Sequence, residues 1–246
     1  KVMAATTSHR PWRSTTPPSR DTSRKSGPRG RAVRAVSGAF ITLEGVEGVG
    51  KTTCTRTVEN TLSAAGHDVV VTREPGGTPL GEKIRKWVLD GDHPALSAET
   101  EALLMFAARA HHLDEVIRPA LAKGRWVVCD RFTDATIAYQ GGGRRVDARW
   151  LDGLKAGVQR GLEPDLTLLL DAPVEVGLAR ISDRNPDHFE RESFTFFERV
   201  RTAYLKLAET HPTRIKVIDA SQPVAKVEAQ LRSVLADFAR GFKDSA

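Results

Sequence analysis

Residues 44–53 have the sequence Glu44-Gly-Val-Glu-Gly-Val-Gly-Lys-Thr-Thr53, in which Lys51 and Thr52 follow three closely spaced glycines. The apolar residues 39–43 before it are predicted to form a short strand, and residues 52–65 after it a helix that Gly66 ends. A glycine-rich turn between a strand and a helix directs several backbone N–H groups at one anion. Glycines also let the backbone approach phosphates where a Cβ would clash. The stretch therefore predicts a phosphate-binding loop.

The residue types of this loop suit the phosphates of a nucleotide and a metal ion. We expect Lys51 to reach the β- and γ-phosphates and the Thr52 hydroxyl to bind Mg²⁺. The backbone on either side is expected to surround the phosphates. The residues predicted to bind the phosphates are Gly45, Val46, Glu47, Gly48, Val49, Gly50, Lys51, Thr52 and Thr53.

Short apolar segments alternate with helical segments along the rest of the chain. Each apolar segment is rich in Val, Ile and Leu on both faces, as is typical of parallel strands covered on both sides. The predicted strands are Phe40–Glu44, Asp68–Arg73, Trp126–Asp130, Leu166–Asp171 and Ile215–Asp219. We therefore predict an α/β fold, a doubly wound parallel sheet of about five strands flanked by helices. Ligands of such sheets collect at the carboxyl ends of the strands.

Three longer helices are predicted from apolar periodicity and capping residues. One begins with Ser97 as its N-cap, and Pro119 is expected to kink or interrupt it. Its predicted apolar face consists of Leu103, Phe106, Ala107, Ala110 and Leu113. The other two helices are predicted over residues 193–210 and 224–238.

The positive charge of the chain is concentrated in its first 38 residues. The net charge is +6 over 246 residues, but residues 1–38 hold nine Lys or Arg and one acid, so the remainder carries −2. This segment is also rich in Ser, Thr and Pro, and it cannot bury enough apolar surface to offset its ordering entropy. We expect residues 1–38 to be a disordered basic extension and residues 39–246 to be the folded domain.

Three roles are open for the basic extension. It is a plain solvated extension, a transit peptide for import into an organelle, or an arm that contacts RNA, DNA or polyphosphate. Because the folded part is near neutral, a nucleic-acid-binding domain is disfavoured. The absence of an apolar h-region argues against secretion. No run of 18 apolar residues predicts a membrane span, and the two cysteines, Cys54 and Cys129, suit a reducing compartment, so we predict a cytoplasmic location.

Charged residues end the second and third predicted strands. Arg73 ends the second strand, and Asp130 and Arg131 end the third. The two arginines are suited to bidentate capture of a phosphate or carboxylate, and Asp130 to binding Mg²⁺ directly or through water. The simpler roles are a surface salt bridge for each arginine and a turn or helix cap for Asp130. We favour the ligand roles because these strand ends face the phosphate loop.

Two further segments combine an aromatic ring with a polar group. Phe106 and Arg109 are three positions apart on the predicted helix and share a face, so together they could hold a flat heterocycle. Tyr139 and Gln140 precede three glycines that we expect to form a flexible turn, and Gln140 could pair with the edge of a base. Taken singly, Phe106 fits an ordinary core position and the second segment an ordinary glycine-rich loop.

These motifs, taken in order, resemble the thymidylate kinase family. The resemblance covers residues 39–240 or so and rests on residues 44–53, Thr72-Arg-Glu-Pro-Gly-Gly77, Met105-Phe-Ala-Ala-Arg109, Asp130-Arg131, Ala138-Tyr-Gln-Gly-Gly-Gly143 and Glu175-Val-Gly-Leu178. It implies a P-loop fold like that of nucleoside-monophosphate kinases, with ATP and Mg²⁺ as cofactors and dTMP as substrate. It also implies a homodimer, with the helix that bears Phe106 as a contact.

The resemblance implies roles for the base and sugar contacts. Phe106 matches the residue that stacks on thymine, and Arg109 the residue that reaches a base carbonyl. Thr136 and Gln140 match residues at the ring N3 edge. Tyr139 lies by the deoxyribose, where it would disfavour a 2′-hydroxyl.

The resemblance also assigns the phosphate end of the substrate. Glu47 matches a residue near the sugar 3′-hydroxyl and the metal-bound phosphates, and Pro75 helps to shape the pocket for the thymine methyl. Arg73 and Arg131 match residues that hold the acceptor phosphate. Asp130 joins Thr52 as a predicted metal ligand.

Phosphoryl transfer needs positive charge around the moving group, and the loop contains no arginine. Family members that lack a loop arginine supply arginines from a lid, and Arg180 and Arg184 match this arrangement in a lid at about residues 180–192. A solvated charged turn is the simpler role for this segment. The predicted catalytic residues are Lys51, Arg131, Arg180 and Arg184.

The sequence departs from the family pattern at two positions. Ala135 stands where a serine is usual, which removes a hydroxyl near the base. His188 stands where another cation is often found, and a histidine carries only part of a charge at neutral pH.

We therefore expect transfer of a phosphoryl group from ATP to dTMP, giving dTDP and ADP. One alternative is another P-loop nucleoside-monophosphate or deoxynucleoside kinase, although Arg73 and Arg131 favour a phosphorylated acceptor. The other is a nucleotide-dependent protein that binds nucleic acid through the basic extension.

Overall fold

The computed structural model describes residues 38–90, 96–181, 189–190 and 192–244. The predicted extension, apart from Gly38, lies outside these residues.

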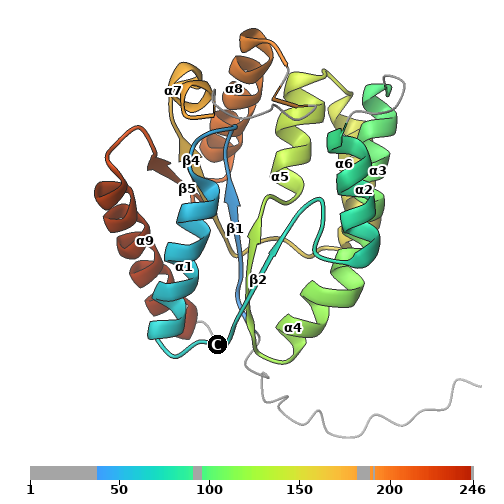
Figure 1. Ribbon diagram of the computed structural model, residues 1–246. Helices are drawn as coiled ribbons and strands as arrows, with labels where there is room; N and C mark the ends of the chain where they lie inside the picture. Colours follow the sequence, from blue (N-terminus) through green and yellow to red (C-terminus); the bar gives the residue numbers. More distant parts are fainter. Residues whose placement is uncertain (1–37, 91–95, 182–188, 191, 245–246) are drawn as a thin grey trace, which may run out of the picture. The chain divides into compact units, whose positions relative to one another are not determined.

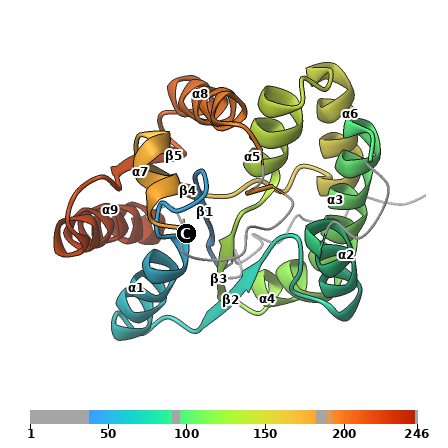
Figure 2. The same cartoon turned by 45° about the horizontal axis from the view of Figure 1, so that its top comes forward.

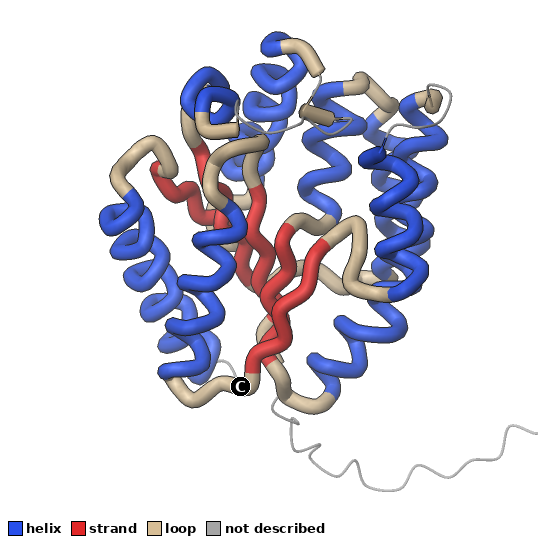
Figure 3. The backbone as a smooth tube through the Cα atoms, viewed as in Figure 1, coloured by secondary structure: helices blue, strands red, loops and turns tan. Residues whose placement is uncertain are grey.

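A parallel five-stranded sheet forms the centre of the described domain (Figures 1 and 3). Its strands are β1 (Phe40–Glu44), β2 (Val69–Arg73), β3 (Trp126–Asp130), β4 (Leu166–Asp171) and β5 (Ile215–Asp219). They are arranged in the order β2-β3-β1-β4-β5, and every neighbouring pair is parallel. The predicted α/β sheet and its strands are therefore confirmed, with β2 beginning one residue later than expected.

Helices cover both faces of this sheet (Figure 1). Helices α1 (Lys51–Ala64) and α9 (Val224–Asp244) pack on one face, and α3 (Ala98–His112) continues into α4 (Arg118–Ala122) on the other. The remaining helical segments are α2 (Pro79–Asp90), η1 (Leu113–Ile117), α5 (Thr133–Thr136), η2 (Ile137–Gly143), α6 (Ala148–Gln159), α7 (Val174–Ala179) and α8 (Phe194–Thr210). No described helix combines the length and the apolar character needed to cross a membrane.

The central strand β1 is buried along its whole length and supplies both halves of the core. Ile41 belongs to the cluster that contains Val58 of α1 and Leu231 of α9. Its neighbour Phe40 points to the opposite face, into a cluster with Leu113 and Ile117. Successive side chains of a strand alternate between faces, so a strand covered on both sides carries apolar residues on both faces.

Helix α3 begins where the sequence predicts, because the Ser97 side chain accepts a hydrogen bond from the Thr100 backbone N–H. Its buried face, however, differs from the prediction. Leu103 is 48% exposed, whereas Glu101 and Arg109 are buried. Apolar periodicity alone does not predict that a charged residue such as Glu101 is buried. The structure buries Glu101 and Arg109 because each has a charged partner inside the domain.

The glycines 141–143 form part of the π-helical segment η2, and the prediction of a flexible turn is wrong. A Cβ on Gly142 would lie 2.6 Å from the Cβ of Ala203, and one on Gly143 would lie 2.5 Å from the ring of Phe196. Both of these neighbours belong to α8. The glycines therefore allow η2 and α8 to pack closely. A similar π-helical segment, η1, interrupts the long helix just before Pro119, as predicted.

Candidate functional site

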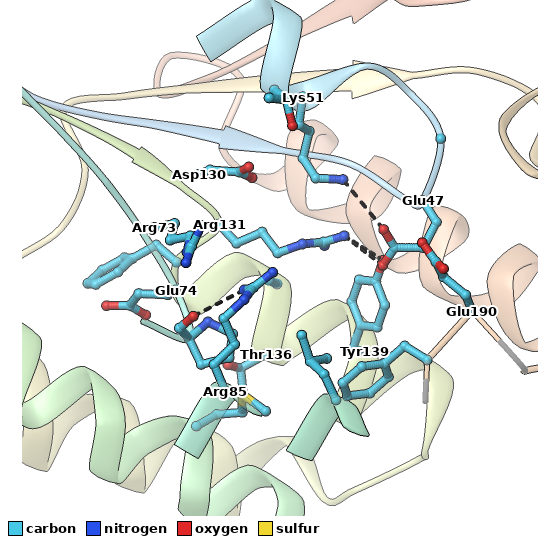
Figure 4. Close-up of a pocket in the computed structure, with 18 of the residues that line it drawn as sticks. Glu47, Lys51, Arg73, Glu74, Arg85, Asp130, Arg131, Thr136, Tyr139 and Glu190 are labelled. Atoms are coloured by element: carbon cyan, nitrogen blue, oxygen red, sulfur yellow. Dashed lines mark hydrogen bonds and ion pairs between the residues drawn. The ribbon is translucent and has the colours of Figure 1, made fainter. Parts of the chain in front are cut away.

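A cavity of about 630 Å³ opens at the carboxyl ends of β1, β2 and β3. Figure 2 brings these strand ends forward, with α1 and α7 on one side of them and α2 and α3 on the other. Many predicted site residues line the cavity, several of them drawn in Figure 4. They are Glu47, Gly48, Gly50, Lys51, Thr52, Thr53, Arg73, Pro75, Arg109, Asp130, Arg131, Thr136, Tyr139, Gln140 and Arg180. The fold thus brings residues of the phosphate loop, of the segments after β2 and β3, and of α3 and η2 to one cavity.

The phosphate loop joins β1 to the N-terminus of α1. Gly48 and Gly50 adopt positive φ angles of 72° and 89°, which favour glycine. The Lys51 ammonium donates hydrogen bonds to the carbonyls of Gly45 and Val46, at 3.1 and 2.8 Å. Burial, and then the charge of Arg131, lower the pKa of Lys51 to about 8. Lys51 therefore lies at the loop, in an environment that makes an added anion favourable.

The two valines of the loop differ from their neighbours. Val46 and Val49 are 3% and 2% exposed and pack in the core cluster. Only their backbone groups are therefore available to a ligand. The side chains fasten the loop to the domain.

Helix α7 packs against the same loop at very short range. A Cβ on Gly177 would lie 2.4 Å from the Glu47 carbonyl oxygen, and one on Gly48 would lie 1.9 Å from the carbonyl oxygen of Gly177. Residues without a Cβ are therefore needed on both sides of this contact. The segment Glu175-Val-Gly-Leu178 thus acts by shaping the loop.

Arg131 occupies the middle of the cavity with a positive φ of 68°. One of its amino groups donates to Glu47 at 2.8 Å and to the Tyr139 hydroxyl at 3.1 Å. The other donates to the Gly45 carbonyl at 3.1 Å. Burial alone would raise the pKa of Glu47, but Arg131 and Lys51 outweigh it and lower the pKa to about 2. Glu47 is therefore a carboxylate at neutral pH.

A second acid, Glu44, lies completely buried behind Arg131. It accepts hydrogen bonds from the Phe132 backbone N–H and from the Tyr204 hydroxyl, both at 2.7 Å. Burial, and then the charge of Asp134, raise the pKa of Glu44 to about 8. These contacts fix the turn that follows β3. Sequence reasoning missed Glu44 because its importance depends on partners far away in the chain.

Asp130 lies at the end of β3, beside Arg131 (Figure 4). Its Oδ1 atom is buried and has no hydrogen-bond partner among the residues that the structure describes. An unpaired buried carboxylate oxygen is costly unless a cation or water completes it. Asp130 and the nearby Thr52 hydroxyl therefore offer the oxygen ligands that a Mg²⁺ ion prefers.

The opposite end of the cavity contains a buried charged network. Glu74 accepts a hydrogen bond from Arg109 Nε at 2.7 Å and contacts His112 Nδ1 at 2.9 Å. The Arg109 Nη2 group donates to the hydroxyl of Thr136 at 2.9 Å and to the Phe132 carbonyl at 3.2 Å. Its Nη1 group is buried and, within the described part of the chain, has no partner. Arg109 is therefore held rigidly with one donor left over.

Phe106 does not line the cavity, which differs from the prediction that it stacks on a base. Its ring lies 3% exposed in a cluster with Val146 and Leu151. Met105 lines the cavity in its place. Met105 is four positions before Arg109 and Phe106 three, and both spacings share a helix face. The phase of α3 decides between them.

The structure adds Arg85 to the predicted arginines. Arg73 and Arg85 both line the cavity, and Arg85 donates to the Pro75 carbonyl at 3.1 Å. Burial, followed by the charges of Arg73 and Arg131, lowers the pKa of Arg85, so these three guanidinium groups share one region. Arg73 itself forms an exposed ion pair with Glu82 at 2.8 Å. Sequence reasoning missed Arg85 because helix α2 was not predicted.

Part of the predicted lid also borders the cavity. Arg180, Phe189 and Glu190 line it, and Arg180 donates to the Ala220 carbonyl at 3.0 Å. Arg184 and His188 lie outside the described residues. Ala135 lines the cavity as expected, without a hydroxyl to offer.

A model of the thymidylate kinase family matches residues 43–231. The chain is also 54% identical over 199 residues to the thymidylate kinase of Bordetella petrii, covering 80% of this chain and 95% of that protein. The thymidylate kinase of Alkalilimnicola ehrlichii is 55% identical over 201 residues, covering 81% and 93%.

The chain belongs to the thymidylate kinase family. A crystal structure of thymidylate kinase from Ehrlichia chaffeensis has the same fold, with a TM-score of 0.68 and 32% identity. The match covers 81% of this chain and 99% of the Ehrlichia chaffeensis chain. Membership of the thymidylate kinase family makes this chain an ATP-dependent nucleoside-monophosphate kinase that phosphorylates dTMP. The predicted family, fold and activity are confirmed, and the comparisons give no support to the two alternatives.

Proposed function

We propose that the cavity binds dTMP with its base at Arg109 and its phosphate near Arg131, while the loop binds the phosphates of ATP. One observation carries this assignment. A single cavity is lined both by the phosphate loop and by Arg109, whose buried Nη1 group lacks a partner among the described residues. Donor and acceptor phosphates would meet between these two ends. The cavity thus supports a direct transfer between two bound nucleotides.

At the base end, Arg109 Nη1 donates to a carbonyl of thymine. Thr136 and Gln140 border the same region and offer further polar contacts to the ring edge. Met105 and Pro75 supply apolar contacts to the ring and its methyl group. A buried donor that is satisfied only by a ligand discriminates strongly against ligands that lack the acceptor.

At the acceptor phosphate, we assign Arg73, Arg85 and Arg131. Arg131 already binds the carboxylate of Glu47, so a phosphate oxygen would bind the same guanidinium beside or in place of it. The Tyr139 hydroxyl donates to Glu47 at 2.9 Å, and we place the sugar of dTMP beside this pair. Clustered arginines also explain why the substrate must carry a phosphate.

The transfer itself needs positioning and positive charge. An oxygen of the dTMP phosphate attacks the γ-phosphorus of ATP, and the bond from that phosphorus to the β–γ bridging oxygen breaks, releasing ADP. Lys51 and Arg131 stabilise the charge that develops, with Arg180 and Arg184 of the lid as the further predicted cations. The acceptor oxygen is already anionic, so no general base is required. Thr52 and Asp130 would hold a Mg²⁺ ion, which when bound neutralises phosphate charge.

We further propose a lid at residues 180–192 and a homodimer. The described ends of the lid border the cavity, as closure over the nucleotides requires.

The dimer is supported by apolar side chains that α2 and α3 expose. Leu80, Trp87 and Leu103 are 45%, 46% and 48% exposed. Light scattering on the purified protein tests the dimer. Cytoplasmic location stays a prediction, and both cysteines are unpaired.

A coupled assay of ADP release tests the function directly. The purified chain is supplied with MgATP and, in turn, dTMP, dUMP, dCMP, dGMP, UMP or thymidine. We expect a strong preference for dTMP and no activity on thymidine, because the arginines need a phosphate to bind. A preference for another acceptor would overturn the assignment of the base pocket.

The pKa of Lys51 predicts how activity depends on pH. A charged ammonium is needed to bind the phosphates, and its pKa of about 8 in the free enzyme means that this charge is lost as pH rises. We expect kcat/KM for ATP to fall about tenfold between pH 7 and pH 9. The corresponding fall in kcat should lie at higher pH, because bound phosphates stabilise the ammonium. A kcat/KM profile that stays flat over this range would contradict the role of Lys51.

Gly177→Ala should impair the phosphate loop from outside the cavity. Alanine favours a helix over glycine by about 1 kcal/mol, but its Cβ would press on the backbone of Glu47. We expect kcat/KM for ATP to fall about ten- to a hundredfold, since small displacements of a positioned group are costly.

Gly153→Ala is the matched control for this prediction. Gly153 lies within α6, and a Cβ there would have no neighbour within 4 Å. It should therefore stabilise the protein by about 0.5–1 kcal/mol and leave ATP kinetics unchanged. Equal kinetics for the two variants would show that the contact between α7 and the loop is unimportant.

A further inference from the structure

Glu101 is a buried acid that lies next to the cavity without lining it. It belongs to α3 and is only 2% exposed. Its Oε1 accepts a hydrogen bond from Gln140 Nε2 at 2.7 Å, and its Oε2 lies 3.4 Å from a guanidinium nitrogen of Arg144. Arg144 also pairs with Glu192, and its guanidinium lies 4.9 Å from the centre of the Phe196 ring. A carboxylate that is buried in this way loses its hydration, so it depends on partners such as these for its stability.

The contact with Glu101 decides which way the Gln140 amide points. A side-chain amide has a donating and an accepting end, and the two are nearly identical in shape. A carboxylate only accepts hydrogen bonds, so the NH₂ group of Gln140 must face Glu101. Gln140 lines the cavity and is itself 3% exposed. Its carbonyl oxygen is therefore the end that remains for a ligand.

Gln140 and Arg109 then present a fixed pair of groups to a ring edge. Gln140 lies four positions after Thr136, on the same side of a helical segment, and Thr136 contacts Arg109 at 2.9 Å. Arg109 Nη1 is a donor and Gln140 Oε1 an acceptor. This order complements a ring carbonyl next to a ring N–H, as in thymine and uracil. A cytosine ring carries the opposite pattern, with an amine and a bare ring nitrogen at these places.

We propose that Glu101 is a positioning residue that selects pyrimidines with a ring N–H by locking the orientation of the Gln140 amide. This inference rests on the proposed function, because it assumes that the base lies between Arg109 and Gln140. The residue acts through Gln140 and does not touch the substrate. Its pairing with Arg144, at 3.4 Å, holds the carboxylate in place.

A substrate that lacks the ring N–H separates this role from a purely structural one. The probes are dTMP and 5-methyl-dCMP, which keeps the ring methyl group but carries a bare ring nitrogen in place of the N–H and an amine in place of the adjacent carbonyl. The wild-type enzyme should prefer dTMP by at least about tenfold in kcat/KM, because the buried contacts at the ring edge are lost with 5-methyl-dCMP. Glu101→Gln can present either end of its own amide to Gln140, so Gln140 is free to turn. The preference should then fall at least about threefold, through the KM for dTMP, with the KM for ATP unchanged.

Glu99→Gln is the matched control, because it makes the same chemical change at an exposed position of the same helix. It should keep the wild-type preference. If Glu101→Gln does not fold, Glu101→Asp retains a carboxylate and should retain the preference as well. Loss of the preference in Glu101→Asp would overturn the inference.

The results also distinguish a failure of the proposed function from a failure of the role of Glu101. A wild-type enzyme that does not phosphorylate dTMP would remove the proposed function itself. A wild-type enzyme that uses dTMP and 5-methyl-dCMP equally would remove Gln140 from the N–H contact, and the inference with it. If the wild type discriminates and Glu101→Gln discriminates equally, the function stands and the inference fails. A loss of kcat for both substrates with the same ratio would show that Glu101 is only structural.

Discussion

Replacing Lys51 with alanine is expected to lower kcat by about 10²–10³-fold, the loss typical of one preorganised charge that stabilises a transition state. The Lys51 ammonium lies within 3.1 Å of two loop carbonyls, and Arg131 and Glu47 are its charged neighbours. No described cation other than Lys51 belongs to the loop itself, so no neighbour on the loop could replace it. Steady-state kinetics at saturating ATP and dTMP measure the effect.

Lys206→Ala is the control for this variant, since Lys206 is exposed on α8 and does not line the cavity. It should have wild-type kcat and KM values. A Lys51→Ala enzyme with kcat near that of Lys206→Ala would remove the catalytic role of the loop lysine.

Arg109→Met is expected to have the second large effect, on both substrate affinity and stability. Methionine fills similar volume but removes the donor that we assign to the thymine carbonyl. We expect the KM for dTMP to rise about 10²-fold, with the KM for ATP little changed. The change also leaves Glu74, which is 3% exposed, without its arginine. Breaking a buried ion pair in this way costs about 3–5 kcal/mol of unfolding free energy.

Two further variants separate the effect on dTMP affinity from the effect on stability. Arg56→Met removes an exposed arginine of α1 and should change neither KM nor stability. Adding Glu74→Gln to Arg109→Met should recover part of the lost stability, because the unpaired charge is removed, but not the affinity for dTMP. Equal increases in both KM values for Arg109→Met would indicate general damage and would contradict the assignment to the base pocket.

The sheet and the phosphate loop could be predicted because their signals are local. Apolar residues on both faces of a segment such as Phe40–Glu44 indicate a buried parallel strand without knowledge of its neighbours. The glycine, lysine and threonine of the loop likewise have a meaning that depends only on their spacing. Carboxyl ends of parallel strands lie on one edge, so Arg73, Asp130 and Arg131 could be placed together from the same reasoning.

The rest of the site depends on contacts between distant segments. Met105 and Phe106 are both compatible with a partner at Arg109, and only the packing of Phe106 against Val146 and Leu151 directs Met105 to the cavity. Buried acids such as Glu44 and Glu101 violate apolar periodicity, because their partners lie elsewhere in the chain. Sequence patterns place such residues on the surface.

A crystal structure of the protein with dTMP bound would test where the base and the phosphate of the substrate bind. The measured quantity is the distance from Arg109 Nη1 to the nearest thymine carbonyl oxygen, with the place of the phosphate. We expect a hydrogen bond of about 2.7–3.2 Å and a phosphate bound by Arg73, Arg85 and Arg131. A dTMP phosphate seated in the loop beside Lys51, with the base away from Arg109, would contradict this assignment.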